Sequence, residues 1–232
     1  MHAGNLARLA FALTVAAPLT TLAQTRTALP PGSAVPAGSA PVVRRDDWQR
    51  VPDIFTALQA KPGSRIADLG AGEGWLTQRL AKHVGPSGRV FAVDISDAAL
   101  GRLSETLQKE TLGNVELVLA EDDDPRLPFG TLDGVVIVNA YHEMTKRVPV
   151  LEGVKRALRP GGLLVIVENT PPDSIQTRKG QVDRHQLALD FVRDDLEAQG
   201  FEIVSTDPKF VDRKMTDHSM RQWLLVARRA AK

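Results

Sequence analysis

The stretch that decides the fold is Ile66-Ala-Asp-Leu-Gly-Ala-Gly-Glu-Gly74, a short apolar run followed by three glycines at every second position. Glycine lets a chain leave a strand and turn sharply into a helix without a Cβ clash, and it lets a ligand lie against bare backbone. The carboxylate of Asp68 argues against a phosphate-binding loop, because two anions would repel each other. We therefore expect a ligand that carries an ammonium group.

The glycine spacing differs from two familiar nucleotide-binding patterns. The dinucleotide fingerprint is Gly-x-Gly-x-x-Gly, whereas this turn reads Gly-x-Gly-x-Gly after Asp-Leu. A Walker loop requires Gly-Lys-Ser or Gly-Lys-Thr, which this turn lacks. A glycine-rich turn alone also fits an ordinary connection between a strand and a helix, so the downstream sequence has to decide.

Downstream, the apolar run Arg89-Val-Phe-Ala-Val-Asp94 ends in an acid that follows Gly74 by 20 residues. In open α/β sheets ligands bind beyond the carboxyl ends of the strands, and an acid about 20 residues after the glycine turn binds the ribose hydroxyls. Alone, Asp94 would also fit a helix N-cap. Together with the glycine turn, we predict that its carboxylate accepts hydrogen bonds from both ribose hydroxyls.

These motifs together resemble those of the class I S-adenosylmethionine (SAM)-dependent methyltransferases. Asp68 to Gly74 resembles the first motif of that family, and Asp94 resembles the acid that ends its second strand. Arg159-Pro-Gly-Gly-Leu-Leu-Val-Ile-Val-Glu168 resembles its Pro-Gly-Gly turn and fifth strand. Asn139-Ala-Tyr-His-Glu143 resembles the segment after strand four in a bacterial subgroup near the quinone-biosynthesis methyltransferases. The resemblance covers roughly residues 46 to 228 and implies SAM as cofactor and a small-molecule methyl acceptor.

Alternating strand and helix patterns predict an α/β fold, a doubly wound and mostly parallel seven-stranded sheet with helices on both faces. Strands are expected at 65–69, 89–93, 115–120, 133–138, 163–168, 200–204 and 222–227. The last two are expected to pair as a C-terminal antiparallel hairpin, which the resemblance also implies. Between the fifth strand and this hairpin, one long amphipathic helix is expected from Gly180 to about Gln199.

The predicted cofactor residues follow the first four strands. They are Asp68, Gly70, Ala71, Gly72 and Gly74 in the first turn, Asp94 and Ile95, then Asp122 and Asp123, and Asn139. Ile95 is expected to pack on adenine, and Asn139 to face the methionine end. In the family an acid after strand three accepts a hydrogen bond from the adenine amino group. Counting forward from Asn114 favours Glu121 for this role and counting back from Leu127 favours Asp123; we assign it to Asp122 and Asp123. For the run Glu121-Asp-Asp-Asp124, the alternative is a solvated acidic loop without a cofactor contact.

Two residues are predicted to serve catalysis. His142 is the general-base candidate, because the ordinary pKa of histidine lies near neutrality; a structural histidine that bonds a loop carbonyl is the alternative. Glu143 is expected to orient His142 or to cap the next helix, and Glu168 is considered as a residue that faces the cleft. The segment Asp183-Arg-His185 is expected to open the helix after strand five, with Asp183 as an exposed cap. No ligand set spaced like a metal site was found.

Composition adds limits rather than a function. The 232 residues carry a formal net charge of +1, which implies neither nucleic acid nor an anionic membrane as a partner. The chain has no cysteine, so disulfides, thiolate metal sites and thiol nucleophiles are excluded. The acceptor and the oligomeric state are left open.

The N-terminal part reads differently from the rest. Residues 1–23 resemble a signal peptide, with a short apolar stretch after Arg8 and small residues before Gln24. Residues 24–43 form a linker rich in Pro, Ala, Gly and Ser, and 44–232 form the methyltransferase domain. We therefore expect a periplasmic or secreted protein without stable membrane insertion, or a cytoplasmic one if the start codon is misassigned.

Two other functions are weighed against this one. An NAD-linked oxidoreductase is disfavoured by the glycine spacing, by Asp68 and by the Pro-Gly-Gly turn. A catalytically silent, exported SAM-binding module of the same fold is motivated by the signal peptide, since SAM is made in the cytosol and fold alone does not prove activity.

Overall fold

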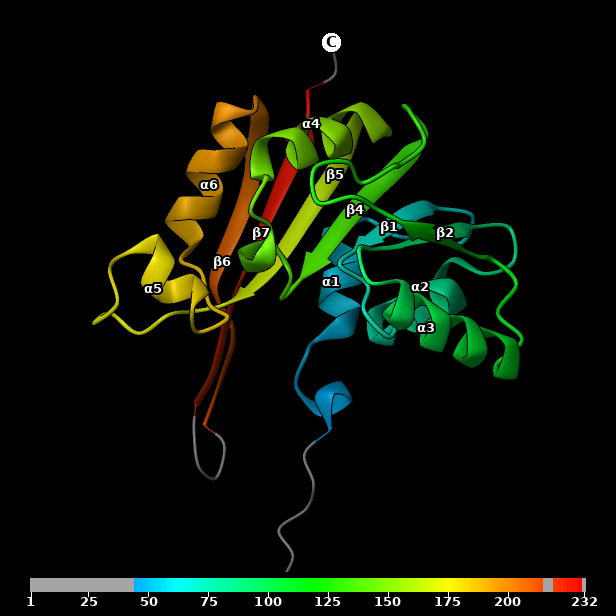
Figure 1. Ribbon diagram of the computed structural model, residues 1–232, viewed down its shortest axis with the longest axis horizontal. Helices are drawn as coiled ribbons and strands as arrows, with labels where there is room; N and C mark the ends of the chain where they lie inside the picture. Colours follow the sequence, from blue (N-terminus) through cyan, green and yellow to red (C-terminus); the bar gives the residue numbers. More distant parts are fainter. Residues whose placement is uncertain (1–43, 215–218, 231–232) are drawn as a thin grey trace, which may run out of the picture. The chain divides into compact units, whose positions relative to one another are not determined.

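The computed structural model describes residues 44–214 and 219–230 of the chain (Figure 1). The predicted signal peptide, residues 1–23, and the predicted linker, residues 24–43, lie outside the described residues. Within the described part of the chain, no helix combines the length and the apolar content that crossing a membrane requires.

A seven-stranded sheet forms the centre of the domain, in the strand order β3-β2-β1-β4-β5-β7-β6 (Figure 1). The strands are β1 (Arg65–Leu69), β2 (Arg89–Asp94), β3 (Val115–Leu119), β4 (Leu132–Val138), β5 (Leu158–Asn169), β6 (Phe201–Lys214) and β7 (Ser219–Arg229). Strands β1 to β5 pair in parallel, whereas β7 pairs antiparallel with both β5 and β6. The predicted fold class, including the C-terminal antiparallel hairpin, is confirmed.

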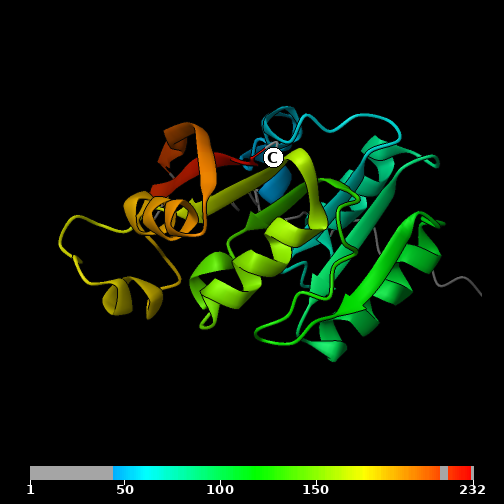
Figure 2. The ribbon, with the colours of Figure 1, turned by 90° about the horizontal axis from the view of Figure 1, so that it is seen from above.

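Helices cover both faces of this sheet (Figure 2). They are α1 (Val51–Ala57), α2 (Trp75–Val84), α3 (Asp97–Lys109), α4 (Arg147–Ala157), α5 (Arg178–Val182) and α6 (Leu189–Ala198), with 3-10 turns η1 (Arg45–Asp47) and η2 (Tyr141–Glu143). Buried side chains of α1 and α2 share one core with the sheet, and those of α4 and α6 share the other. Along β5, Leu164 and Ile166 belong to one core and Val165 and Val167 to the other, which is why this strand reads as a continuous apolar run.

The single long helix predicted from Gly180 to about Gln199 is wrong, because the chain breaks between α5 and α6. Leu187 in this break is fully buried, and its carbonyl accepts a hydrogen bond from the Trp223 indole at 2.7 Å. The Gln181 side chain accepts from the Ala188 backbone N–H at 2.8 Å. Tertiary contacts thus override the helical pattern, and Asp183 ends α5 instead of opening a helix.

Strands β6 and β7 are longer than the predicted 200–204 and 222–227. Exposed polar residues and Pro208 hide the continuation of β6 in the sequence. Its pairing with β7 shifts register at Ile203/Ser205 and again at Asp207/Val211, so no regular alternation was there to detect.

Candidate functional site

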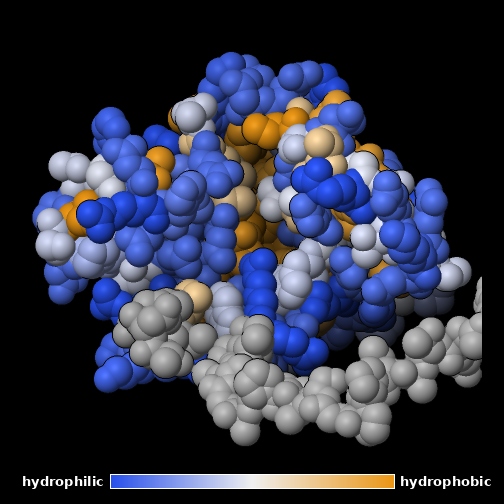
Figure 3. Space-filling view, turned by 60° about the horizontal axis from the view of Figure 1, so that its bottom comes forward, coloured by the Kyte–Doolittle hydropathy of each residue, from blue (hydrophilic) through white to orange (hydrophobic). Residues whose placement is uncertain are grey.

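A cavity of about 280 Å³ lies where the carboxyl ends of β1 to β4 meet, the edge at which open α/β sheets bind ligands. On this side the surface is hollowed, with apolar residues at its floor (Figure 3). The lining comes from residues after four strands: Leu69 and Gly70, Asp94 and Ile95, Ala120, Glu121, Asp122 and Pro125, then Ala140, Glu143, Met144, Thr145 and Val150. A second hollow of about 620 Å³ lies at the opposite strand ends around Arg65 and Arg89 and contains none of the predicted site residues.

The carboxylate of Asp94 is held in place at the wall of the cavity. Its Oδ2 accepts the Gly72 N–H at 2.7 Å, and its Oδ1 accepts the Ser96 N–H at 2.9 Å. Each carboxylate oxygen has a further lone pair. Asp94 can therefore bind two hydroxyl groups in the cavity without reorganising, as a ribose requires.

Two of the three glycines in the first turn are needed for packing as well as for the turn. A Cβ on Gly70 would lie 2.4 Å from the Cβ of Ala140, and a Cβ on Gly74 would lie 2.1 Å from Leu103 Cδ1. Both glycines have a positive φ, +80° and +79°. Gly70 thus lets the end of β1 approach the segment that follows β4, which closes the cavity from two sides.

The side of the cavity predicted to hold adenine presents an apolar surface and two acids. Ile95 is 66% exposed although it is a large apolar residue, and it lines the cavity. Glu121 and Asp122 also line it, whereas Asp123 does not. Lys146 pairs with Asp122 at 3.1 Å and with Asp123 at 3.2 Å, so this lysine ties the acidic loop to α4.

Asp68 is buried near the end of β1 and does not line the cavity. Thr77 donates its hydroxyl to Asp68 Oδ2 at 2.6 Å. Burial raises the pKa of the Asp68 carboxyl to about 6, while the Thr77 hydrogen bond and the charge of Arg45 act in the opposite direction. Arg45 itself stacks over the Trp75 ring at 3.9 Å. Ala71, Gly72, Gly74 and Asn139 also lie outside the cavity lining.

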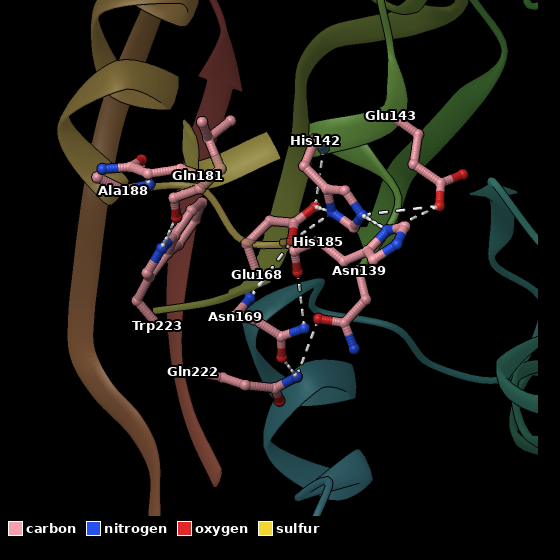
Figure 4. Close-up of polar contacts among 11 residues, drawn as sticks. Asn139, His142, Glu143, Glu168, Asn169, Gln181, His185, Ala188, Gln222 and Trp223 are labelled. Atoms are coloured by element: carbon pink, nitrogen blue, oxygen red, sulfur yellow. Dashed lines mark hydrogen bonds and ion pairs between the residues drawn. The ribbon is translucent and has the colours of Figure 1, made fainter. Parts of the chain in front are cut away.

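On the far side of the cavity, His142 is held by a buried carboxylate (Figure 4). Its Nδ1 lies 3.1 and 3.0 Å from the two oxygens of Glu168, whose side chain is fully buried, and its backbone N–H donates to Glu168 Oε1 at 3.1 Å. Burial lowers the pKa of His142, but the hydrogen bond and charge of Glu168, together with the charge of Glu143, outweigh it and raise the pKa. Because an ionised carboxylate only accepts, we assign the proton to Nδ1, which leaves Nε2 directed away from Glu168.

Two further side chains meet this Nε2 atom. His185 Nδ1 lies 3.3 Å from it and Glu143 Oε1 lies 3.6 Å from it. Glu143 also lines the cavity, so it connects the histidine pair to the cofactor side. The sequence suggested His142 and Glu143, but it placed His185 only in a helix-opening segment; no local signal predicts a contact between residues that are 43 positions apart.

A polar network fixes the strand ends behind these residues. Gln222 Nε2 donates to Asn139 Oδ1 at 2.9 Å and to Asn169 Oδ1 at 3.0 Å, and Gln222 Oε1 accepts from Gln49 at 2.7 Å. Asn169 in turn donates to the His185 carbonyl at 3.1 Å (Figure 4). Asn139, predicted at the methionine end, thus takes part in the support of the histidine segment.

The fold and this site resemble those of one class of protein. A mostly parallel sheet ending in β5-β7-β6, an acid fixed at the end of β2 and an apolar cavity beside it are the features of a class I SAM-dependent methyltransferase domain. The fixed carboxylate of Asp94 and the exposed Ile95 side chain lie where that class holds the adenosyl group of SAM.

Comparison with known proteins leads to the same class. Residues 66–162 match the family model of a methyltransferase domain. The ubiquinone/menaquinone biosynthesis C-methyltransferase UbiE of Ectopseudomonas mendocina is 36% identical over 127 residues, which are 54% of this chain and 48% of that protein. The chain spans about half the length of the curated relatives it matches.

Solved structures share the fold at low sequence identity. A SAM-dependent methyltransferase from Aquifex aeolicus superimposes with a TM-score of 0.63 at 22% identity, over 77% of this chain and 89% of that one. Phosphoethanolamine N-methyltransferase 2 of Haemonchus contortus, solved with SAM, superimposes with a TM-score of 0.61 at 16% identity, over 79% of this chain and 53% of that one. At these identities the solved structures establish the fold, and SAM as the cofactor of this chain belongs to the proposed function.

Proposed function

We propose that this protein transfers the methyl group of SAM to a small-molecule acceptor. The observation that carries the proposal is the Asp94 carboxylate, which two backbone amides hold at the cavity wall with lone pairs left for two ribose hydroxyls. Methyl transfer is an in-line displacement at a sulfonium, so the protein contributes mainly by positioning the two reactants. A cavity walled by Asp94 on one side and Glu143 on the other supports that task.

The residues around the first turn suit the methionine end of SAM, which is a zwitterion. Asp68 supplies a negative charge for the ammonium group, and Arg45 supplies a positive charge for the carboxylate. Burial already raises the pKa of Asp68 to about 6, so the arrival of a cation would favour its ionised form. We assign the direct cofactor contact on this side to Gly70, which lines the cavity, and a longer-range electrostatic role to Asp68 and Arg45.

The acceptor side of the cavity is assigned to Glu143 and His142. Glu143 reaches the cavity directly, and His142 contacts Glu143 through Nε2 while Glu168 fixes its ring. Glu168 does not touch the cavity lining and is a positioning residue. Relatives named for quinone biosynthesis make phenols and quinols the first acceptors to test.

Calorimetry and a product assay test the proposal. We expect SAM, and not NAD, to bind the full chain with one site, and we expect release of S-adenosylhomocysteine with an acceptor drawn from phenols, quinols, amines and thiols. Binding of NAD without SAM would favour the oxidoreductase. SAM binding without turnover on any acceptor class would favour the silent module.

Export is proposed as well, and residues 1–23 are the basis for it. The native protein is then expected to begin at Gln24 and to be found in the periplasmic or secreted fraction. Mass spectrometry of the protein from fractionated cells decides this point. An intact Met1 in the cytosolic fraction would contradict export and would place the enzyme beside the cytosolic SAM supply.

A further inference from the structure

His142, Glu143 and His185 bring three possible metal ligands into one place, at the acceptor end of the cavity (Figure 4). The two histidine nitrogens are 3.3 Å apart, His142 Nε2 lies 3.6 Å from Glu143 Oε1, and His185 Nδ1 lies 3.8 Å from the same oxygen. The point equidistant from these three atoms is about 2.1 Å from each. Zinc–nitrogen and zinc–carboxylate bonds are about 2.0–2.2 Å long.

The surroundings of His142 match those of a metal-binding histidine. Such a histidine usually donates its other ring N–H to a carboxylate, which fixes the ring and the tautomer. Glu168 is fully buried and lies 3.0 Å from His142 Nδ1, so the lone pair of Nε2 is directed at the other two ligand atoms. A simple hydrogen bond between His142 and His185 would not require a buried carboxylate behind His142, whereas a metal-binding histidine usually has one.

The backbone of His185 is held by hydrogen bonds on both sides. Its N–H donates to the Val182 carbonyl at 2.9 Å, and its carbonyl accepts from Asn169. The side chains of His185 and Glu143 are 75% and 66% exposed. An ion therefore has a path to the site from solvent, and ligand positions beyond the three protein atoms remain open.

We propose that His142, Glu143 and His185 bind a divalent first-row transition metal ion of the zinc type. Two histidines and one carboxylate with open positions form a ligand set typical of catalytic zinc and non-haem iron sites. The absence of cysteine from the chain removes the thiolate ligands that would select softer ions.

The metal ion would add a catalytic role to the proposed methyl transfer, and this role rests on the proposed function. It would lie beside Glu143 at the cavity and present open positions to an oxygen atom of the acceptor, so the acceptor class would be phenols or other oxygen-bearing molecules. The lone pair of His142 Nε2 then binds the ion. The same lone pair cannot also take a proton, and the general-base role predicted from the sequence is thereby replaced.

Titration of the untagged, full-length apoprotein with Zn²⁺ and with Co²⁺ tests the site, by calorimetry and by the visible absorption of bound Co²⁺. We expect one tight site per chain, with affinity at least a hundredfold weaker in His185→Ala and in Glu143→Gln. Glu168→Gln should weaken it by about ten- to a hundredfold. His83→Ala is the matched control, since His83 is exposed and bonds a loop carbonyl far from the cluster.

Equal Zn²⁺ affinity in wild type, His185→Ala and Glu143→Gln would overturn the metal site, as would binding that His83→Ala weakens to the same extent. SAM calorimetry on the same variants separates the two proposals. SAM binding without a metal site leaves methyl transfer standing, whereas a metal site without SAM binding overturns only the proposed function. Both His185→Ala and Glu143→Gln replace exposed side chains, so folding is expected to survive.

Discussion

The two ends of the cavity are built in different ways. The adenosine end is local: Gly72, Asp94 and Ser96 lie within 25 positions of one another, and two backbone amides orient the carboxylate. The acceptor end is assembled from distant segments, since His142 meets Glu168 across 26 positions and His185 across 43. Short-range geometry thus orients the Asp94 carboxylate, while the cluster around His142 depends on long-range packing.

The largest expected effect comes from a substitution at the acceptor end, at His142. His142→Ala should lower the turnover of methyl transfer by roughly 10² or more, because loss of a residue behind a metal ligand already costs about 10–100-fold and His142 is itself one of the proposed ligands. SAM affinity should barely change, because His142 does not line the cavity. Steady-state release of S-adenosylhomocysteine and SAM calorimetry are the measurements, with His83→Ala as the control. Unchanged turnover would show that His142 is structural.

The next effect concerns the support of the cofactor end and depends on pH. The pKa of Asp68 rises from 3.8 to about 6 on folding, chiefly through burial. Its protonated form is therefore favoured in the folded state, so its contribution to stability is present below pH 4 and is lost as the pH rises through 6. Asp68→Asn keeps an acceptor for Thr77 without the charge, and should stabilise the apoprotein by about 3 kcal/mol at pH 8, at 1.36 kcal/mol per pKa unit.

Denaturant unfolding of Asp68→Asn and wild type at pH 4 and pH 8 checks this. The stabilisation should shrink toward zero at pH 4. Glu105→Gln, which removes an exposed carboxylate, is the control and should show no such pH-dependent difference. A constant difference at both pH values would refute the assigned pKa.

A slightly smaller effect sharpens the role of Asp94. Asp94→Ala should weaken SAM binding roughly a hundredfold, since hydrogen bonds to charged groups contribute about 1.5–3 kcal/mol each. The variant should also lose about 1 kcal/mol of apoprotein stability, because the Gly72 and Ser96 amides lose their acceptor. Calorimetry and denaturant unfolding measure the two effects, with the exposed acid at Asp97 changed to Ala as the comparison. Full SAM affinity in Asp94→Ala would remove the ribose assignment.

The smallest effect probes the contact between the two ends. A Cβ added at Gly72 meets no atom within 4 Å, so Gly72→Ala should lower the free energy of unfolding by only about 1 kcal/mol, because of the positive φ. Gly70→Ala would also press against Ala140 at 2.4 Å and should cost about 1–3 kcal/mol more. Ala140→Gly in the Gly70→Ala background should recover that excess in denaturant unfolding. If it does not, the close approach of β1 to the segment after β4 is not the cause.

The sequence predicted the glycine turn and the strand end at Asp94 because their signals are short-range. Glycines at alternate positions, an apolar strand and an acid at the end of the next strand specify the backbone turn that they form. The predicted sheet and its antiparallel hairpin followed from the same kind of pattern. For the acidic loop, counting along the chain could not select a register, and the structure places Glu121 and Asp122, rather than Asp123, on the cavity wall.

Only the tertiary structure decided the acceptor end. The sequence suggested one helix from Gly180 to Gln199, but burial of Leu187 and the Trp223 hydrogen bond interrupt it, and this interruption places His185 beside His142. Glu168 and Glu143 join them from β5 and η2. Periodicity along a chain reports which faces are apolar, but it carries no information on which loops meet in space. The backbone turn around Asp94 was therefore contained in the sequence, whereas the three-residue cluster arose from packing.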